Sequence, residues 1–203
     1  MHTQPNVKRI KRNEAILVLI DLQERLLPAM HGGEERIALS ARLIRGCRVL
    51  GTPVLATQQY TRGLGATVGE VALALTEALP ADKDGAGAVP AADFVPVEKT
   101  SFSAMGEPEF ARRLKESGKR SVLVCGVEAH VCVLQTVLDL LAAGFDAFFV
   151  SDLISSRKRG DAEAAFRRMA AAGAVETTYE SVLFELLEGA GKSGFKQISG
   201  LVK

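Results

Sequence analysis

Uninterrupted runs of apolar residues are the clearest pattern along this chain. The first covers residues 15–20 and stops at Asp21, and similar runs cover residues 122–125 and 147–150. Runs of this length with no polar residue are typical of strands buried on both faces, as in parallel sheets. Shorter apolar segments add further strands. The six predicted strands are residues 15–20, 52–57, 94–97, 121–125, 147–150 and 174–177.

Between these strands, apolar residues recur every three or four positions, which predicts helices. Glycines end four of them, since glycine is favoured just beyond a helix C-terminus. Thr177 and Glu180 have the spacing of a capping box for a last helix through Leu187. The other helices are predicted within residues 37–50, 67–79, 108–118, 133–141 and 165–173.

Strand and helix thus alternate about six times along one chain. This alternation predicts an α/β fold, a three-layer α/β/α sandwich around a mostly parallel six-stranded sheet. We expect one domain over residues 1–203. Residues 1–14 form a polar N-terminal segment, either a solvated tail or a docking patch, and residues 80–92, rich in Gly, Pro and Asp, form a surface loop.

The composition narrows the classes of partner. The chain has 203 residues with 25 Lys and Arg against 24 Asp and Glu, so its net charge is +1. This balance, together with the absence of Trp, argues against a nucleic-acid partner or an anionic membrane surface. No apolar run approaches the length of a membrane span. Three cysteines without a paired motif fit the reducing cytoplasm. We therefore expect a cytoplasmic protein that acts on a small molecule.

Three chemically active residue types follow different predicted strands. Asp21 follows the first, Lys99 the third, and Cys132 the fourth. The carboxyl ends of parallel strands meet at one edge of the sheet, where ligands bind in such folds. Cys132 also falls in the first turn of a predicted helix, where the helix dipole should lower the pKa of a thiol. The pattern predicts a reactive site.

Further polar and aromatic residues come directly after the same strands. Each has a structural alternative, because aromatic rings pack in cores and buried glutamines bond to backbone groups. The candidates for substrate binding are Gln23, Gln58, Tyr60 and Phe102.

Several segments together resemble the isochorismatase-like cysteine hydrolases. They are LVLIDLQ (residues 17–23), VEKTSF (97–102), VCGVEAHVCV (124–133) and ESVLFEL (180–186), and the last is similar to isochorismatase-domain-containing hydrolases. The resemblance covers about residues 14–190. It implies a catalytic triad of Asp21, Lys99 and Cys132, and a homo-oligomer.

The resemblance also implies a cis peptide bond between Val127 and Glu128, which presents backbone N–H groups, with that of Cys132, to a substrate oxyanion. The related nicotinamidases bind a metal through an Asp-x-His element after the second strand. Here that region reads TQQYTRG (57–63), without carboxylate or imidazole. We therefore expect no metal and no cofactor, and a substrate other than nicotinamide.

The hypothesis that combines these features is a cysteine hydrolase acting on a small amide-like substrate through a thioester. Asp21 takes the thiol proton, and Lys99 favours the thiolate. Two alternatives stay open: hydrolysis of a vinyl ether, with Cys132 a bystander, and a scaffold that binds a partner without catalysis. The resemblance gives His130 no catalytic role, so we expect a structural or subunit contact there.

Overall fold

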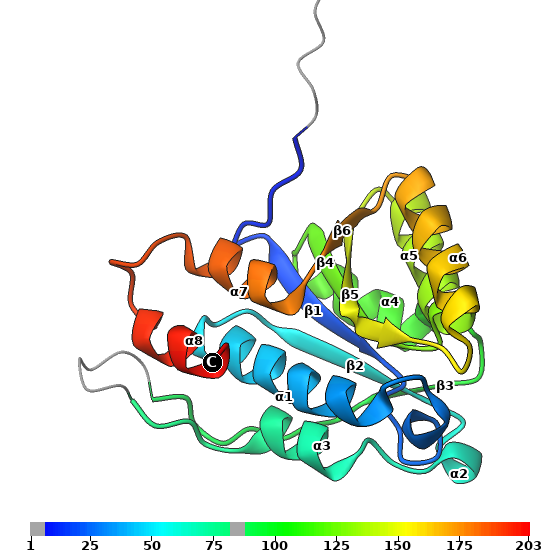
Figure 1. Cartoon of the computed structure of the whole chain (residues 1–203), viewed down its shortest axis with the longest axis horizontal. Helices are drawn as coiled ribbons and strands as arrows, with labels where there is room; N and C mark the ends of the chain where they lie inside the picture. Colours follow the sequence, from blue (N-terminus) through cyan, green and yellow to red (C-terminus); the bar gives the residue numbers. More distant parts are fainter. Residues whose placement is uncertain (1–6, 82–87) are drawn as a thin grey trace, which may run out of the picture.

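A sheet of six parallel strands forms the centre of the fold, in the order β3-β2-β1-β4-β5-β6 (Figure 1). The structure, a computed structural model, describes residues 7–81 and 88–203. The sheet confirms the predicted α/β class, and every strand pair is parallel. The strands are β1 (Ala15–Ile20), β2 (Val54–Gln59), β3 (Val97–Lys99), β4 (Ser121–Val127), β5 (Asp146–Ser155) and β6 (Val175–Thr177).

Helices cover both faces of the sheet, which completes the three layers. Helix α1 packs against α3, α7 and α8 on one face, while α4, α5 and α6 lie on the other (Figure 1). The helices are α1 (Gly33–Val49), α2 (Thr61–Leu64), α3 (Gly69–Thr76), α4 (Pro108–Glu116), α5 (Leu134–Ala142), α6 (Arg159–Ala171), α7 (Tyr179–Leu187) and α8 (Phe195–Leu201).

The apolar runs occupy the middle of this sandwich. All six residues of β1 and all seven of β4 are buried, because helices exclude water from both faces of these strands. The chain proceeds from β1 outward to β2 and β3, then returns to the other side of β1 as β4. The strand order therefore reverses between β1 and β4, which is where open α/β sheets form ligand sites.

Several predicted boundaries were wrong. Strand β2 begins at Val54 and β3 at Val97, each directly after a proline, which has no N–H for the sheet ladder. The residue that caps α7 is Thr178, whose side chain accepts a bond from the Ser181 N–H, because β6 continues through Thr177. Strand β5 runs on to Ser155, past an irregularity in its pairing with β4. Helices α2 and α8 were not predicted.

The polar N-terminal segment is attached to the domain at Lys8 and Ile10. Ile10 is buried, and its N–H donates to the Glu185 carboxylate at 3.0 Å. Within the predicted loop, residues 82–87 lie outside the described residues, and the described remainder forms no helix. Among the helices of residues 7–81 and 88–203, none has the length and apolar character needed to cross a membrane.

Candidate active site

Asp21 occupies an unusual backbone position at the end of β1. Its φ is +53°, a left-handed conformation that Asp and Asn adopt more readily than most residues. The neighbouring strand is held close here, since a Cβ on Gly126 of β4 would lie 2.0 Å from the Ile20 carbonyl oxygen. A side chain at position 126 is thus excluded, and Asp21 lies against the loop that follows β4.

A buried ion pair joins Asp21 to Lys99. The Lys99 ammonium lies 2.8 Å from Asp21 Oδ2, and both side chains have no exposed surface. Lys99 is the last residue of β3, two strands from β1, so its side chain reaches past the end of β2. It also donates to three oxygens: Gln59 Oε1 at 2.5 Å, the Phe102 carbonyl at 3.1 Å and the Ser101 carbonyl at 3.2 Å.

Strand β2 supplies two residues of this site that the sequence analysis missed. Thr57 Oγ1 donates to Asp21 Oδ1 at 2.7 Å, and Gln59 accepts from Lys99. Thr57 and Gln59 are two apart, so they lie on the same face of the strand, whereas Gln58 lies on the opposite face. The alternation along the second predicted strand was the signal that could have found them.

Cys132 lies in a π-helical turn, Ala129–Val133, that connects β4 to α5. Cys132 is 7% exposed. The Cys132 carbonyl accepts from Thr136 Oγ1 at 2.7 Å, and the same hydroxyl accepts from the Ala104 N–H at 2.9 Å. Thr136 therefore links the cysteine turn to the segment after β3, whose carbonyls hold Lys99.

The predicted lowering of the thiol pKa was wrong. Burial raises the pKa of the Cys132 thiol to about 12, the negative charge of Asp21 adds to the rise, and Lys99 opposes it. Burial also raises the pKa of Asp21, against the lowering effects of Lys99, Thr57 and Cys132. The effects of lost water and of Asp21 on the thiol pKa outweigh that of the Lys99 ammonium. Both acid groups therefore favour the protonated form more than free groups do.

The start of the cysteine turn is fixed to the loop after β5. The bond between Val127 and Glu128 is cis. The Glu128 carboxylate accepts from the Arg157 N–H at 3.1 Å and from Arg157 Nε at 3.0 Å. His130 lies 2.9 Å from the Ser156 hydroxyl through Nδ1. His130 therefore makes a structural contact within its own chain.

The four candidate substrate ligands have different surroundings. The Gln23 amide is occupied by backbone groups, including both the N–H and the carbonyl of Gln59. Gln58 is buried on the other face of β2. Tyr60 and Phe102 are each 54% exposed. Tyr60 follows the end of β2, and Phe102 comes shortly after Lys99 at the end of β3. In the described part of the chain, no group of three His, Cys, Asp or Glu side chains could hold a metal.

Comparisons with known proteins identify the family of this chain. The family model described as isochorismatase domain matches residues 15–181. This chain belongs to the isochorismatase family. Isochorismatase domain-containing protein 1 from Salmo salar is 41% identical over 184 residues, which is 90% of this chain and 59% of that protein. The chain thus spans about three fifths of the length of that relative.

Two solved structures have the same fold. The structure described as MAR1 ribonuclease from Caenorhabditis elegans has a TM-score of 0.82 and 36% identity, over 96% of this chain and 92% of that chain. The YcaC gene product from Escherichia coli, described as an octameric hydrolase of unknown specificity, has a TM-score of 0.80 and 24% identity, over 93% and 86%. The fold is therefore that of isochorismatase-family hydrolases.

The ion pair generates a prediction about stability. Asp21→Asn keeps a residue suited to the positive φ, and Lys99→Met keeps most of the side-chain volume. Each single variant should lose about 3–5 kcal/mol of unfolding free energy, because it leaves one buried polar partner uncompensated. The double variant should lose clearly less than the sum of the two, as measured by denaturant unfolding. The exposed pair of Arg112 and Glu116 is the control and should show little coupling. Additive losses at Asp21 and Lys99 would contradict the pairing.

Proposed function

We propose that this protein is a cysteine hydrolase that cleaves the C–N bond of a small amide-like substrate, with Asp21, Lys99 and Cys132 as its catalytic residues. The observation that carries the proposal is the buried contact of a carboxylate and an ammonium group beside a thiol whose pKa both of them influence. Ion pairs with no exposed surface are rare in proteins, and perturbed acid groups concentrate at functional sites.

The resting state in this proposal holds a protonated thiol and an ionised Asp21. Asp21 Oδ2 has its ion pair with Lys99, and a hydrogen bond with the Cys132 thiol lowers the pKa of Asp21, which supports Asp21 as the group that takes the thiol proton. When that proton moves to Asp21, the negative charge moves to sulfur and stays beside the same ammonium. No additional charge is buried, so the transfer avoids a further desolvation cost.

The reaction then follows in two halves. Cys132 Sγ bonds to the substrate carbonyl carbon as its proton passes to Asp21, and Asp21 returns the proton to the nitrogen as the C–N bond breaks. A thioester and an amine result. Asp21 next takes a proton from water, the resulting hydroxide attacks the thioester, and the sulfur leaves with the proton. The products are a carboxylic acid and the free thiol.

The N–H groups of Glu128 and Cys132 are proposed to hold the oxyanion. The Glu128 carbonyl accepts from the N–H groups of Val131 and Val133, so neither bond uses the Cys132 N–H between them. Donors of this kind are worth about 2.7–4 kcal/mol each in related chemistry. Tyr60 and Phe102, exposed beside the site, are proposed to contact the substrate. Gln23 is proposed to hold the end of β2. Gln58 is proposed to contribute to substrate binding less directly than Tyr60 and Phe102.

The remaining properties are extensions of the same proposal. All three cysteines are free and buried, which supports a location in the reducing cytoplasm. The octameric assembly described for the YcaC gene product supports a homo-oligomer, and no cofactor is needed for the steps above.

A second candidate function comes from the MAR1 relative. Its description as a ribonuclease favours RNA as a substrate, against the expectation from composition. In that case a phosphodiester would replace the amide at the same site. Vinyl-ether hydrolysis, which needs Asp21 and Lys99 but no thiol nucleophile, is a third reaction at the same residues.

The role of Cys132 separates these reactions. Wild-type protein and Cys132→Ser should be assayed against a panel of small amides, a single-stranded RNA and isochorismate. We expect the wild type to hydrolyse an amide and the Ser variant to lose at least about 1,000-fold in kcat/KM, since a hydroxyl with a higher pKa replaces the thiol. Mass spectrometry of rapidly quenched wild type should find the acyl group on Cys132.

Cys47→Ser, which alters a buried cysteine on α1, is the matched control and should keep full activity. Hydrolysis of RNA or isochorismate that survives in Cys132→Ser would reject the thiol mechanism. RNA cleavage that is lost in that variant, with no amide turned over by the wild type, would favour the ribonuclease candidate.

Thr136 is expected to act as a positioning residue through its two hydrogen bonds. Thr136→Val keeps the shape and removes the bonds to Cys132 and Ala104, so the sulfur should shift relative to Lys99. We expect kcat to fall about 10- to 100-fold with little change in KM. Thr136→Ser, which restores the hydroxyl, should recover most of the loss. If Thr136→Val lowers stability alone, kcat per folded molecule would stay unchanged, and that result would contradict this role.

A further inference from the structure

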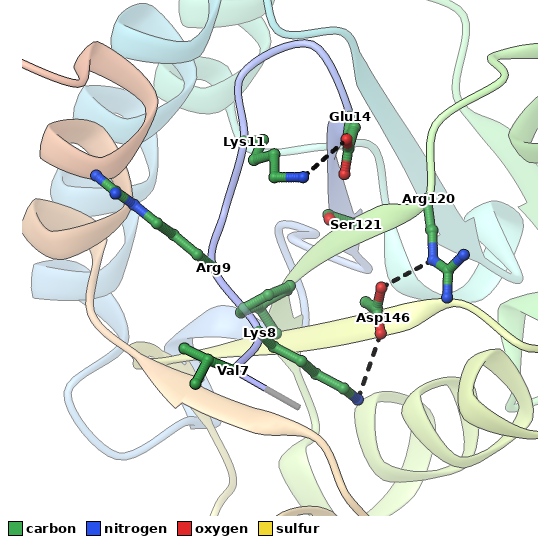
Figure 2. Close-up of a pocket in the computed structure, with 9 residues that line it drawn as sticks. Val7, Lys8, Arg9, Lys11, Glu14, Arg120, Ser121 and Asp146 are labelled. Carbon is green, nitrogen blue, oxygen red and sulfur yellow. Dashed lines mark hydrogen bonds and ion pairs between the residues drawn. The ribbon is translucent and has the colours of Figure 1, made fainter. Parts of the chain in front are cut away.

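A cavity lies at the opposite edge of the sheet from Cys132. It has a volume of about 460 Å³ and is lined by the N-terminal segment and by the beginnings of β4 and β5 (Figure 2). This volume falls in the range of small-molecule sites. Its charged lining residues are Lys8, Arg9, Lys11, Glu14, Arg120 and Asp146.

The cavity carries more positive than negative groups. Four of its residues are basic and two are acidic, which leaves an excess of two positive charges. Lys8 and Arg120 approach one carboxylate, Asp146, from two sides, at 3.4 Å and 3.0 Å (Figure 2). One carboxylate neutralises only one of these cations, so the cluster keeps an unbalanced positive charge.

The walls of the cavity are held in place by the rest of the fold. Lys8 Nζ also donates to the Gly173 carbonyl at 3.1 Å, and the N–H groups of Arg120 and Ser121 both donate to the Glu14 carbonyl. Ser121 is 3% exposed. Only Nε of the Arg120 guanidinium contacts Asp146, and the side chain is 71% exposed. Cationic donors thus border the cavity, and hydrogen bonds hold Lys8 and the start of β4 in place.

We propose that this cavity binds a small molecule through a phosphate-type dianion, held between Lys8 and Arg120. A guanidinium is suited to two phosphate oxygens at once, and the lysine adds a point charge. Asp146 balances only one of these two cations, so a bound anion meets an unbalanced positive charge. The site shares no residue with the proposed catalytic triad, so this inference stands or falls independently of the proposed function.

The test is binding of inorganic pyrophosphate to the full chain by titration calorimetry at low ionic strength, with acetate as a monoanion comparison. Wild type should bind pyrophosphate saturably and acetate at least tenfold more weakly. Lys8→Gln and Arg120→Gln should each weaken pyrophosphate binding about tenfold. Arg159→Gln, which neutralises an exposed arginine on α6, is the control and should leave binding unchanged.

Asp146→Asn separates a loss of ligand contacts from a loss of folding, because it should strengthen binding and an unfolded protein would not. It removes the carboxylate that competes with the ligand for both cations, so it should bind pyrophosphate more tightly than the wild type. The proposal is overturned if the wild type shows no saturable binding, if Arg159→Gln weakens binding as much as Arg120→Gln, or if Asp146→Asn binds no more tightly.

Discussion

The buried ion pair between Asp21 and Lys99 is the constraint on which the rest of the site depends. An ammonium without exposed surface needs a negative partner and further oxygens to replace water. The fold supplies them from separate segments: Asp21 after β1, Gln59 at the end of β2, and two carbonyls after β3. The strand order makes this possible, because β3, β2 and β1 are neighbours and end at the same edge.

The same pair gives the proposed chemistry its electrostatic basis. Burial disfavours both the carboxylate and the thiolate, because each charged group loses its contact with water. The lysine stabilises whichever of them carries the charge. This differs from a thiol activated in advance by a helix dipole. The proposed nucleophile forms only when the proton moves to Asp21, which keeps the sulfur protonated and less open to oxidation between turnovers.

The fold was largely predictable from the sequence, and the site only in part. Continuous apolar runs identify β1, β4 and β5 because burial on both faces leaves no room for polar residues. Strand boundaries failed at Pro53 and Pro96, where a missing N–H outweighs apolar character. Asp21, Lys99 and Cys132 could be proposed from the sequence because each follows a predicted strand. Thr57, Gln59 and Thr136 were missed, because their roles arise from contacts between elements, and the balance between burial and charge at Cys132 requires the three-dimensional packing.

The most direct test of the account is the pH dependence of Cys132 alkylation by iodoacetamide, followed by mass spectrometry, in wild type and in Asp21→Asn. A free cysteine thiol has a pKa of about 8.5. In the wild type the rate should still be rising at about pH 10, because burial and Asp21 hold the pKa of this thiol at about 12. In Asp21→Asn, which removes the negative charge and keeps Lys99, the midpoint should move to lower pH. A wild-type midpoint at or below the free value, or no shift in the variant, would contradict the coupling of thiol, carboxylate and ammonium.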